Sequence, residues 1–367
     1  MAVSTRIDDL LTAHPPAVTE PVDFLLAQFD AGLAWISDPD DRRLLDARLT
    51  EAGAPDPFPG NPIGIGMVGP TILLHGTEAQ RERHLRPMWA GIDRWCQLFS
   101  EPGSGSDLAS LATRAERSGD GWRLDGQKVW TSGAVGARYG LCLARTDPAA
   151  PKNRGITAFL VDLSLPGVEV RPLRQMTGDA EFSEVFLDGV HLAADAVLGP
   201  EGEGWRVAFT TLTNERSSIG SAFAARGAGP VDEAVAAYRE RHEGDPVTRD
   251  RVVQLWIEAE VVRLLAARAA EPGPAGSVLK LLGAEHAQRV REAVVDLLGA
   301  DGMLFEDRGG GTPWARGPRL AFLRSRAATI EGGTSEVMRN VLGERLLGLP
   351  REPDPWHGAP WREVPRS

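Results

Sequence analysis

The sequence predicts an α+β protein with an N-terminal helical domain, a middle antiparallel β-barrel or sandwich and a C-terminal four-helix bundle. Its 367 residues exceed the usual domain size of about 100–150 residues. The spacing of apolar residues also changes twice along the chain, from helical to strand-like and back to helical. We therefore expect domains at residues 1–95, 96–200 and 201–350, followed by a tail at residues 351–367.

Helical spacing marks the first zone. Ile7 and Leu10 are three residues apart, and Phe24, Leu25 and Phe29 repeat a helical interval. Proline and glycine then interrupt the pattern at residues 53–60. We expect short helices joined by loops.

A GIGMVG segment at residues 64–69 matches the GxGxxG pattern of dinucleotide-binding loops. It follows a PGNP turn at residues 59–62 instead of a strand, and Pro70 comes directly after it. Since a dinucleotide loop needs a preceding strand and a βαβ unit, we interpret these glycines as helix-packing positions.

The middle zone consists of short apolar or alternating runs separated by Gly, Asp and Pro. They lie at residues 122–126, 140–143, 156–161 and 185–187. No long helical stretch separates them, so an antiparallel sheet is favoured over a Rossmann fold.

Long amphipathic helices are predicted in the third zone. Asp250 is a candidate N-cap for a helix that carries Leu255 and Ala259 on one face, and Ser277 begins another that carries Val294. Consecutive helices of this length favour an antiparallel bundle.

Composition excludes several classes of protein. The 51 acidic and 40 basic residues give a net charge of -11 without a basic cluster, so we expect no nucleic-acid partner. Cys96 and Cys142 are the only cysteines and no metal-ligand spacing occurs, so we expect neither a disulfide framework nor a metal site. The first 30 residues lack a signal peptide and no membrane helix is apparent, so we expect a cytoplasmic protein.

Two polar motifs lie close together in the β zone. Residues 100–107 read SEPGSGSD, a loop whose backbone N–H groups and hydroxyls can bind an anion or the polar edge of a flat cofactor. Residues 126–133 read GQKVWTSG and place a large aromatic ring beside hydroxyls. An isoalloxazine ring needs both stacking and hydrogen-bond donors.

These two motifs, together with RPLRQMTG at residues 171–178 and GGTSEV and ERLLGL at residues 332–337 and 344–349, occur in the order found in the flavin-dependent acyl-CoA dehydrogenases. The chain resembles that family from about residue 62 to residue 351. The resemblance implies FAD, an acyl-CoA substrate, electron-transfer flavoprotein or a similar acceptor, and a homodimer or homotetramer.

The resemblance also implies the site residues. Thr131 would contact the flavin ring. The aromatic residue of the common motif lies two positions before the threonine, whereas Trp130 lies immediately before it, so Trp130 would shape the wall of the pocket instead of stacking on the ring. Thr334 and Glu336 would reach the FAD phosphates and ribose, although both also suit the N-terminal cap of a helix. The positions implied for the flavin or the thioester end of the substrate are Gln97, Phe99, Ser100, Gly105 and Ser106. The positions implied for substrate binding are Ser106, Asn214 and Arg216.

The general base is not where most of the family has it. That position precedes Gly333-Thr334 and is occupied by Gly332, while Glu331 lies one residue too early. A minority branch that includes isovaleryl-CoA and long-chain enzymes takes its base from an earlier helix, where a glutamate precedes an arginine. Glu215 matches that pattern and is the expected base, with Glu331 as second choice and a site without a functional base as the third possibility.

The implied reaction is α,β-dehydrogenation of an acyl-CoA or acyl-carrier thioester, in which the α-proton goes to Glu215 and the β-hydride to flavin N5. One alternative is a non-catalytic or half-site subunit of a heteromeric enzyme. It is suggested because Asp296 lies where family members commonly have a glutamine for a partner's adenine. Another alternative is a flavin oxidase or monooxygenase on the same fold.

Overall fold

The computed structural model describes residues 1–219, 229–268, 275–304 and 316–365, and only the backbone at residues 215–219, 268 and 275. Its contacts divide the chain into two compact units. Unit 1 comprises Met1–Leu173, Glu181–Asn214 and Trp356–Ser367, and unit 2 comprises Arg174–Ala180 and Glu215–Pro355. The N-terminal helices and the sheet therefore belong to the same unit.

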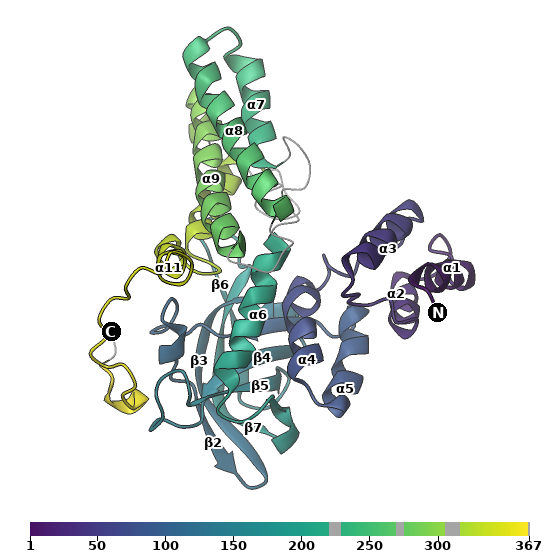
Figure 1. Cartoon of the computed structure of the whole chain (residues 1–367), viewed down its shortest axis with the longest axis vertical. Coiled ribbons are helices and arrows are strands. Elements are labelled where there is room, and N and C mark those ends of the chain that lie inside the picture. Colours follow the sequence, from purple (N-terminus) through teal and green to yellow (C-terminus); the bar gives the residue numbers. More distant parts are fainter. Residues whose placement is uncertain (220–228, 269–274, 305–315, 366–367) are drawn as a thin grey trace. The chain divides into compact units, whose positions relative to one another are not determined.

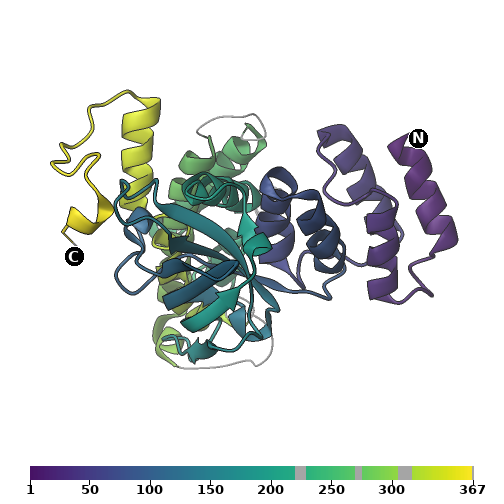
Figure 2. The same cartoon turned by 90° about the horizontal axis from the view of Figure 1, so that it is seen from below.

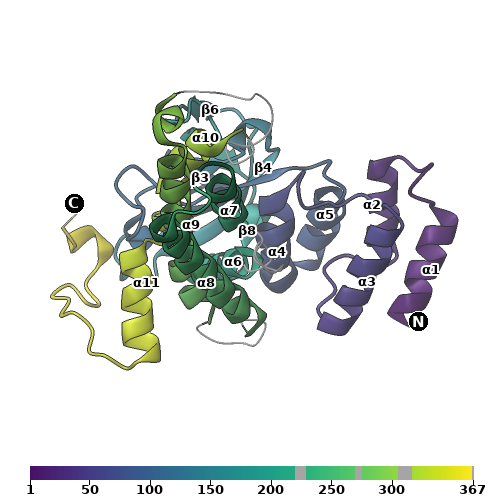
Figure 3. The same cartoon turned by 90° about the horizontal axis from the view of Figure 1, so that it is seen from above.

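Five helices open unit 1. They are α1 (Val3–Ala13), α2 (Pro21–Asp30), α3 (Pro39–Glu51), α4 (Gly69–His75) and α5 (Glu78–Trp89). Ile7, Leu10, Phe24 and Leu25 are buried together, as their helical spacing predicted. Figure 3 shows α1, α2 and α3 lying side by side.

The glycines of residues 64–69 serve helix packing, which confirms the interpretation drawn from their context. Residues Gly64–Val68 form a helical turn that runs directly into α4, and no strand precedes it in residues 1–94, all of which are described. A Cβ atom on Gly69 would come within 2.3 Å of the Trp35 ring. Glycine is required there because the indole packs against the helix backbone.

A single sheet follows the helices. Its strands are β1 (Trp95–Leu98), β2 (Arg114–Ser118), β3 (Gly121–Ser132), β4 (Tyr139–Arg145), β5 (Ile156–Asp162), β6 (Val168–Leu173), β7 (Phe182–Leu192) and β8 (Val197–Leu198). The order is β6-β7-β3-β2-β4-β5-β8, with β1 on β4. The predicted fold class is confirmed, with one refinement: β4 pairs in parallel with β1 and β2, while the other pairings are antiparallel.

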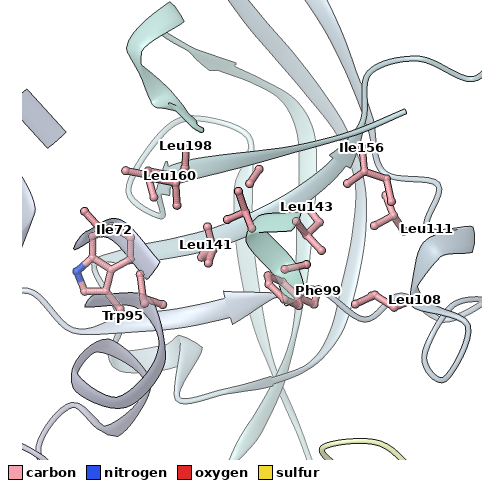
Figure 4. Packing of buried hydrophobic residues seen from close by; sticks show 14 of the residues in the cluster. Ile72, Trp95, Phe99, Leu108, Leu111, Leu141, Leu143, Ile156, Leu160 and Leu198 are labelled. Atoms are coloured by element: carbon pink, nitrogen blue, oxygen red, sulfur yellow. The ribbon is translucent and has the colours of Figure 1, made fainter. Parts of the chain in front are cut away.

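One face of the sheet packs against the helices of unit 1. Leu141 of β4 and Leu160 of β5 share a buried cluster with Ile72 of α4, and Trp95 and Phe99 complete it from β1 and the loop after it (Figure 4). Each such buried side chain contributes roughly 1.5–3 kcal/mol relative to exposure in water. This cluster holds β1 and the loop that follows it in a defined position.

Helix α6 (Gly204–Ile219) follows the sheet, and unit 2 then contains α7 (Pro230–Arg241), α8 (Pro246–Arg268), α9 (Ala275–Leu297), α10 (Pro318–Ser325) and α11 (Ser335–Val341). Figure 1 shows α7, α8 and α9 side by side. Their shared core contains Val252, Leu255, Ala259 and Val294, which confirms the predicted helical faces.

The predicted N-cap of α8 was wrong. The helix begins at Pro246, four residues before Asp250, and the Asp245 side chain accepts a hydrogen bond from the backbone N–H of Val247 at 3.1 Å. An aspartate followed by proline is a strong start signal, because proline lacks the N–H group that the first helical turn leaves unpaired.

No helix in the described part of the chain combines the length and apolar character needed to cross a membrane. Within the same residues, no three His, Cys, Asp or Glu side chains come together as metal ligands.

Candidate functional site

The loop at residues 100–107 is a tight turn at the end of β1. The backbones of Glu101 and Ser104 exchange two hydrogen bonds of 2.9 and 3.0 Å around Pro102 and Gly103. The Ser104 hydroxyl donates to the carbonyl oxygen of Asp107 at 2.9 Å. Ser104 is buried by these contacts, while Gly105 and Ser106 are exposed. The turn therefore presents Gly105 and Ser106 to a ligand from a fixed backbone.

A buried ion pair anchors this loop to the sheet. Lys128 of β3 is fully enclosed, and its ammonium group donates to the Glu101 carboxylate at 2.7 Å and to the carbonyl oxygens of Phe99 and Leu143 at 3.1 and 2.8 Å. The other bonds of Glu101 come from the backbone N–H groups of residues 112 and 113, at 2.6 and 2.8 Å. The pair thus joins the loop to three other segments of unit 1.

The charge state of Glu101 follows from these contacts. Burial alone would raise the pKa of its carboxyl group. The neighbouring Lys128 charge and the hydrogen bonds from Lys128 and residues 112 and 113 outweigh burial, so the pKa lies below its ordinary value. The lowered pKa favours the ionised form of Glu101, which suits its place as the anchor of the loop.

A β-bulge in β3 sets the direction of the second motif. Lys128 pairs with Val185 and Thr131 with Ser183, so Val129 and Trp130 together face a single residue of β7. Trp130 has a positive φ of 59° and a side chain that is 58% exposed. Its indole packs edge-on against Phe182, with the ring centroids 5.9 Å apart. The bulge leaves a large aromatic surface open on the sheet.

The two hydroxyl residues after Trp130 differ in exposure. Thr131 is 1% exposed, and its hydroxyl oxygen has no hydrogen-bond partner among the described residues. Ser132 is half-buried. Thr131, which the resemblance implied as the ring contact, is therefore a buried hydroxyl next to the exposed Trp130 ring.

The other residues of unit 1 that the resemblance implied also differ in exposure. Phe99 is 4% exposed and belongs to the apolar cluster, so only its backbone faces the loop. Gln97 and Ser100 are half-buried. The carbonyl oxygen of Ser100 accepts a hydrogen bond from Val129 at 2.9 Å, which brings the two motifs together.

Unit 2 contains a polar cavity of about 450 Å³ that includes the implied cofactor residues Thr334 and Glu336. Thr334 is the N-cap of α11, and its hydroxyl oxygen accepts from the Val337 N–H at 3.1 Å. Hydrogen bonds from its own backbone and from Thr334 lower the pKa of Glu336. Ser335 is 5% exposed, and its hydroxyl has no partner in the described part of the chain. The other lining residues are Glu285, Gln288, Arg289, Glu292, Thr329, Ile330 and Arg339.

The arginines of this cavity are already paired. Arg339 donates to Glu285 at 2.6 Å, and Arg289 donates to Glu258 at 2.9 Å. Asp296, the unusual residue near the end of α9, pairs with Arg251 at 2.7 Å. The cavity therefore offers hydroxyls to a phosphate, whereas its arginine charges are balanced by glutamates.

The structure describes the surroundings of Glu331, the second candidate base, and of the glycines that follow it. Gly332 and Gly333 have left-handed backbones, with φ values of 63° and 96°, a conformation that disfavours any side chain. Glu331 is 42% exposed and forms a two-pronged ion pair with Arg324 at 3.1 and 3.2 Å. A general base needs a water-poor environment and no neutralising cation beside it. Glu331 is exposed to water and is paired with Arg324, so it meets neither condition.

The side chains of Glu215 and Arg216 lie outside the described residues, although the backbone of both belongs to α6. Asn214 precedes them and is half-buried, and its amide nitrogen has no hydrogen-bond partner among the described residues.

Two domains of one protein family match this chain. Residues 96–190 match the middle domain of acyl-CoA dehydrogenases, and residues 202–347 match the C-terminal domain of the same enzymes. Together they cover most of the sheet, α6 and most of unit 2.

Curated relatives come from Mycobacterium tuberculosis. Acyl-CoA dehydrogenase FadE34 is 44% identical over 323 residues, which are 86% of this chain and 43% of FadE34. Acyl-CoA dehydrogenase IpdE1 is 42% identical over 310 residues, which are 82% of this chain and 78% of IpdE1. The chain thus spans less than half the length of FadE34.

Solved structures of two-component enzymes share the fold. The steroid ACAD Tcur3481-Tcur3483 is 26% identical with a TM-score of 0.74, and the match covers 95% of this chain and 97% of the other. The ChsE4-ChsE5 complex from Mycobacterium tuberculosis is 27% identical with a TM-score of 0.70, and the match covers 95% of each chain.

Proposed function

Because the chain belongs to the acyl-CoA dehydrogenase family, we propose that it catalyses the FAD-dependent α,β-dehydrogenation of an acyl thioester. The observation that carries this proposal is the pre-formed surface of unit 1, where the anchored loop at residues 100–107 and the exposed Trp130 ring meet through the Ser100–Val129 hydrogen bond. When bound, FAD supplies the acceptor for the β-hydride at its N5 atom.

The described residues fit such a cofactor. A Cβ atom on Gly105 would meet no other atom within 4 Å, so the exposed side of the loop has free space beside its backbone. Trp130 offers an aromatic face, and the nearby half-buried Ser132 is proposed to supply a hydroxyl. In unit 2, Thr334 and the Ser335 hydroxyl, which has no partner among the described residues, suit a phosphate, and the Glu336 carboxylate suits the hydroxyls of a ribose.

Glu215 is the proposed base that removes the α-proton. This proposal is supported because the other two positions are poorly suited to act as a base. Gly332 has no side chain, and Glu331 is exposed and paired with Arg324. An apolar pocket would raise the pKa of a carboxylate and make it a stronger base. Asn214 and Arg216 are proposed to contact the substrate, and donors near the thioester carbonyl would stabilise its enolate charge.

Two matched variants test the base. Glu215→Gln should retain FAD but lose flavin reduction by an acyl-CoA about 10²- to 10⁴-fold, the usual contribution of a general base. Glu331→Gln should reduce its flavin at nearly the wild-type rate. The assignment fails if Glu215→Gln reacts normally or if Glu331→Gln is the inactive variant.

A half-site subunit of a heteromeric enzyme is the second candidate. The Arg289 and Arg339 charges of the unit 2 cavity are balanced by glutamates, which is consistent with a cation for the FAD pyrophosphate that comes from a partner subunit. The Tcur3481-Tcur3483 and ChsE4-ChsE5 structures each contain two different polypeptides. A purified chain that stays colourless alone but binds FAD with a paralogous partner would favour this candidate over a homo-oligomer.

The acyl group and the electron acceptor are best identified by a substrate series. Similarity to a steroid ACAD supports including a thioester of a steroid side chain beside straight and branched acyl-CoAs. Electron-transfer flavoprotein is the proposed acceptor. Oxygen consumption without an added acceptor would instead support an oxidase.

A further inference from the structure

The last described residues of the chain return to unit 1. Residues 356–365, named here the C-terminal strap, belong to unit 1 together with the sheet and form the yellow end of the chain beside the C label in Figure 2. The backbone N–H of Trp361 donates to the carbonyl oxygen of Ala150 at 2.9 Å, and that of Arg362 donates to Pro148 at 3.1 Å. Pro360 and Pro151 form an isolated antiparallel β-bridge. The strap therefore docks on the β4–β5 connection by its backbone.

Trp361 inserts its side chain at this contact. It is 8% exposed, and its indole N–H donates to the carbonyl oxygen of Ser110 at 3.3 Å. The guanidinium carbon of Arg145 lies 4.7 Å from the centre of the indole ring, within the range of a cation–π contact. The indole thus covers a buried arginine and reaches residue 110.

Arg145 connects the indole to the segment that follows the cofactor loop. It is 3% exposed, and it donates to the carbonyl oxygens of Ala109 and Leu111 at 2.7 and 3.3 Å and to Lys152 at 2.8 Å. A buried guanidinium forms stronger hydrogen bonds than one in water, because water does not compete for its donors. Covering Arg145 with an aromatic ring therefore strengthens its hold on residues 109 and 111.

Asp107 links Ser110 and Lys152 to the loop at residues 100–107. Its carboxylate accepts from the Lys152 ammonium at 2.9 and 3.0 Å and from the Ser110 hydroxyl at 2.5 Å. Its carbonyl oxygen accepts from the Ser104 hydroxyl inside the loop. A continuous set of contacts therefore runs from Trp361 through Ser110 and Arg145 to the loop at residues 100–107.

We infer that Trp361 is a positioning residue for the loop at residues 100–107, and that the C-terminal strap holds this loop in the conformation that receives its ligand. The inference rests on the proposed function only for the identity of that ligand, FAD with its thioester substrate. Trp361 acts through Arg145 and Ser110 and touches neither the cofactor nor the reacting atoms.

Hydrogen exchange measured by mass spectrometry on the full chain tests the inference. Trp361→Leu keeps an apolar side chain but removes the ring and the indole N–H, and Trp361→Phe restores a ring over Arg145. We expect Trp361→Leu to accelerate amide exchange at residues 103–111 at least about tenfold, and Trp361→Phe to stay within about threefold of wild type. His357→Ala, an exposed change in the same strap, is the matched control and should leave amide exchange unchanged both in the strap and at residues 103–111.

The FAD dissociation constant supplies a second measurement, since it should rise about tenfold in Trp361→Leu and recover in Trp361→Phe. Faster exchange in the strap with unchanged exchange at residues 103–111 would overturn the inference, because the strap would then be a passive tail. A wild-type chain that binds no FAD, either by itself or with a paralogous partner, would refute only the proposed function, and the exchange comparison would still decide the role of Trp361.

Discussion

Replacing Lys128 with methionine breaks the anchor of the cofactor loop. Methionine fills much of the same volume but leaves the Glu101 carboxylate buried with only the N–H groups of residues 112 and 113 as partners. The carbonyl oxygens of Phe99 and Leu143 lose their charged donor at the same time. Lys128 is 0% exposed and Glu101 7%, so water cannot replace the lost bonds without opening the structure.

The expected loss is large for one substitution. Removing one partner of a buried ion pair costs about 3–5 kcal/mol in the free energy of unfolding, because an uncompensated charge remains inside. The loss should depend on pH. In the wild type the Glu101 pKa lies below its ordinary value of 4.5, so its stabilising contribution is present above that pH and is lost as the pH falls through the lowered pKa.

Without Lys128, burial instead raises the Glu101 pKa above the value in the unfolded chain. The variant therefore loses stability as the pH rises from about 4.5 towards 7, and its deficit relative to wild type grows over that range.

Guanidinium denaturation followed by tryptophan fluorescence at pH 5 and pH 7 measures this deficit. Arg171→Met is the matched control, because it breaks an exposed ion pair with Glu169 on the same sheet and should change little. Adding Glu101→Gln to Lys128→Met should restore part of the stability by removing the buried charge. A Lys128→Met deficit below about 1 kcal/mol at pH 7, or one that is equal at both pH values, would refute the reasoning.

Three further substitutions test the site. Thr131→Val should raise the free energy of unfolding by roughly 1 kcal/mol in thermal denaturation, because it removes a buried hydroxyl that has no partner among the described residues; a clear loss would indicate a bond that the hydroxyl makes. Ser132→Ala should leave stability unchanged but weaken FAD binding in a fluorescence titration, and an unchanged dissociation constant would exclude Ser132 from the site. Thr334→Ala should cost about 1 kcal/mol in thermal denaturation by removing the N-cap of α11, and an unchanged melting temperature would show that the cap contributes nothing.

Local patterns predicted much of the fold. Helical spacing identified the buried faces that carry Phe24, Leu255 and Val294. The absence of a strand pattern before residues 64–69 correctly argued against a dinucleotide-binding loop there. Both features depend on neighbours within a few residues, which is the range that sequence periodicity reports.

Contacts between distant segments could not be predicted in this way. The Lys128–Glu101 pair depends on how β3 lies beside the loop after β1, and Trp361 meets Ser110 across 251 positions of the chain. The β-bulge at Val129 and Trp130 also arises from strand register, which single-sequence patterns do not specify. Such contacts carry most of the positioning of the candidate site.

Anaerobic reduction of bound flavin by acyl thioesters tests the central claim most directly. The chain, purified alone and with a paralogous partner, would be mixed with straight, branched and steroid side-chain acyl-CoAs while its visible absorbance is recorded. We predict that at least one thioester bleaches the flavin and that Glu215→Gln, with the same FAD content, does not bleach. A flavin that stays oxidised with every thioester, with and without the partner, would contradict the assignment as an acyl thioester dehydrogenase.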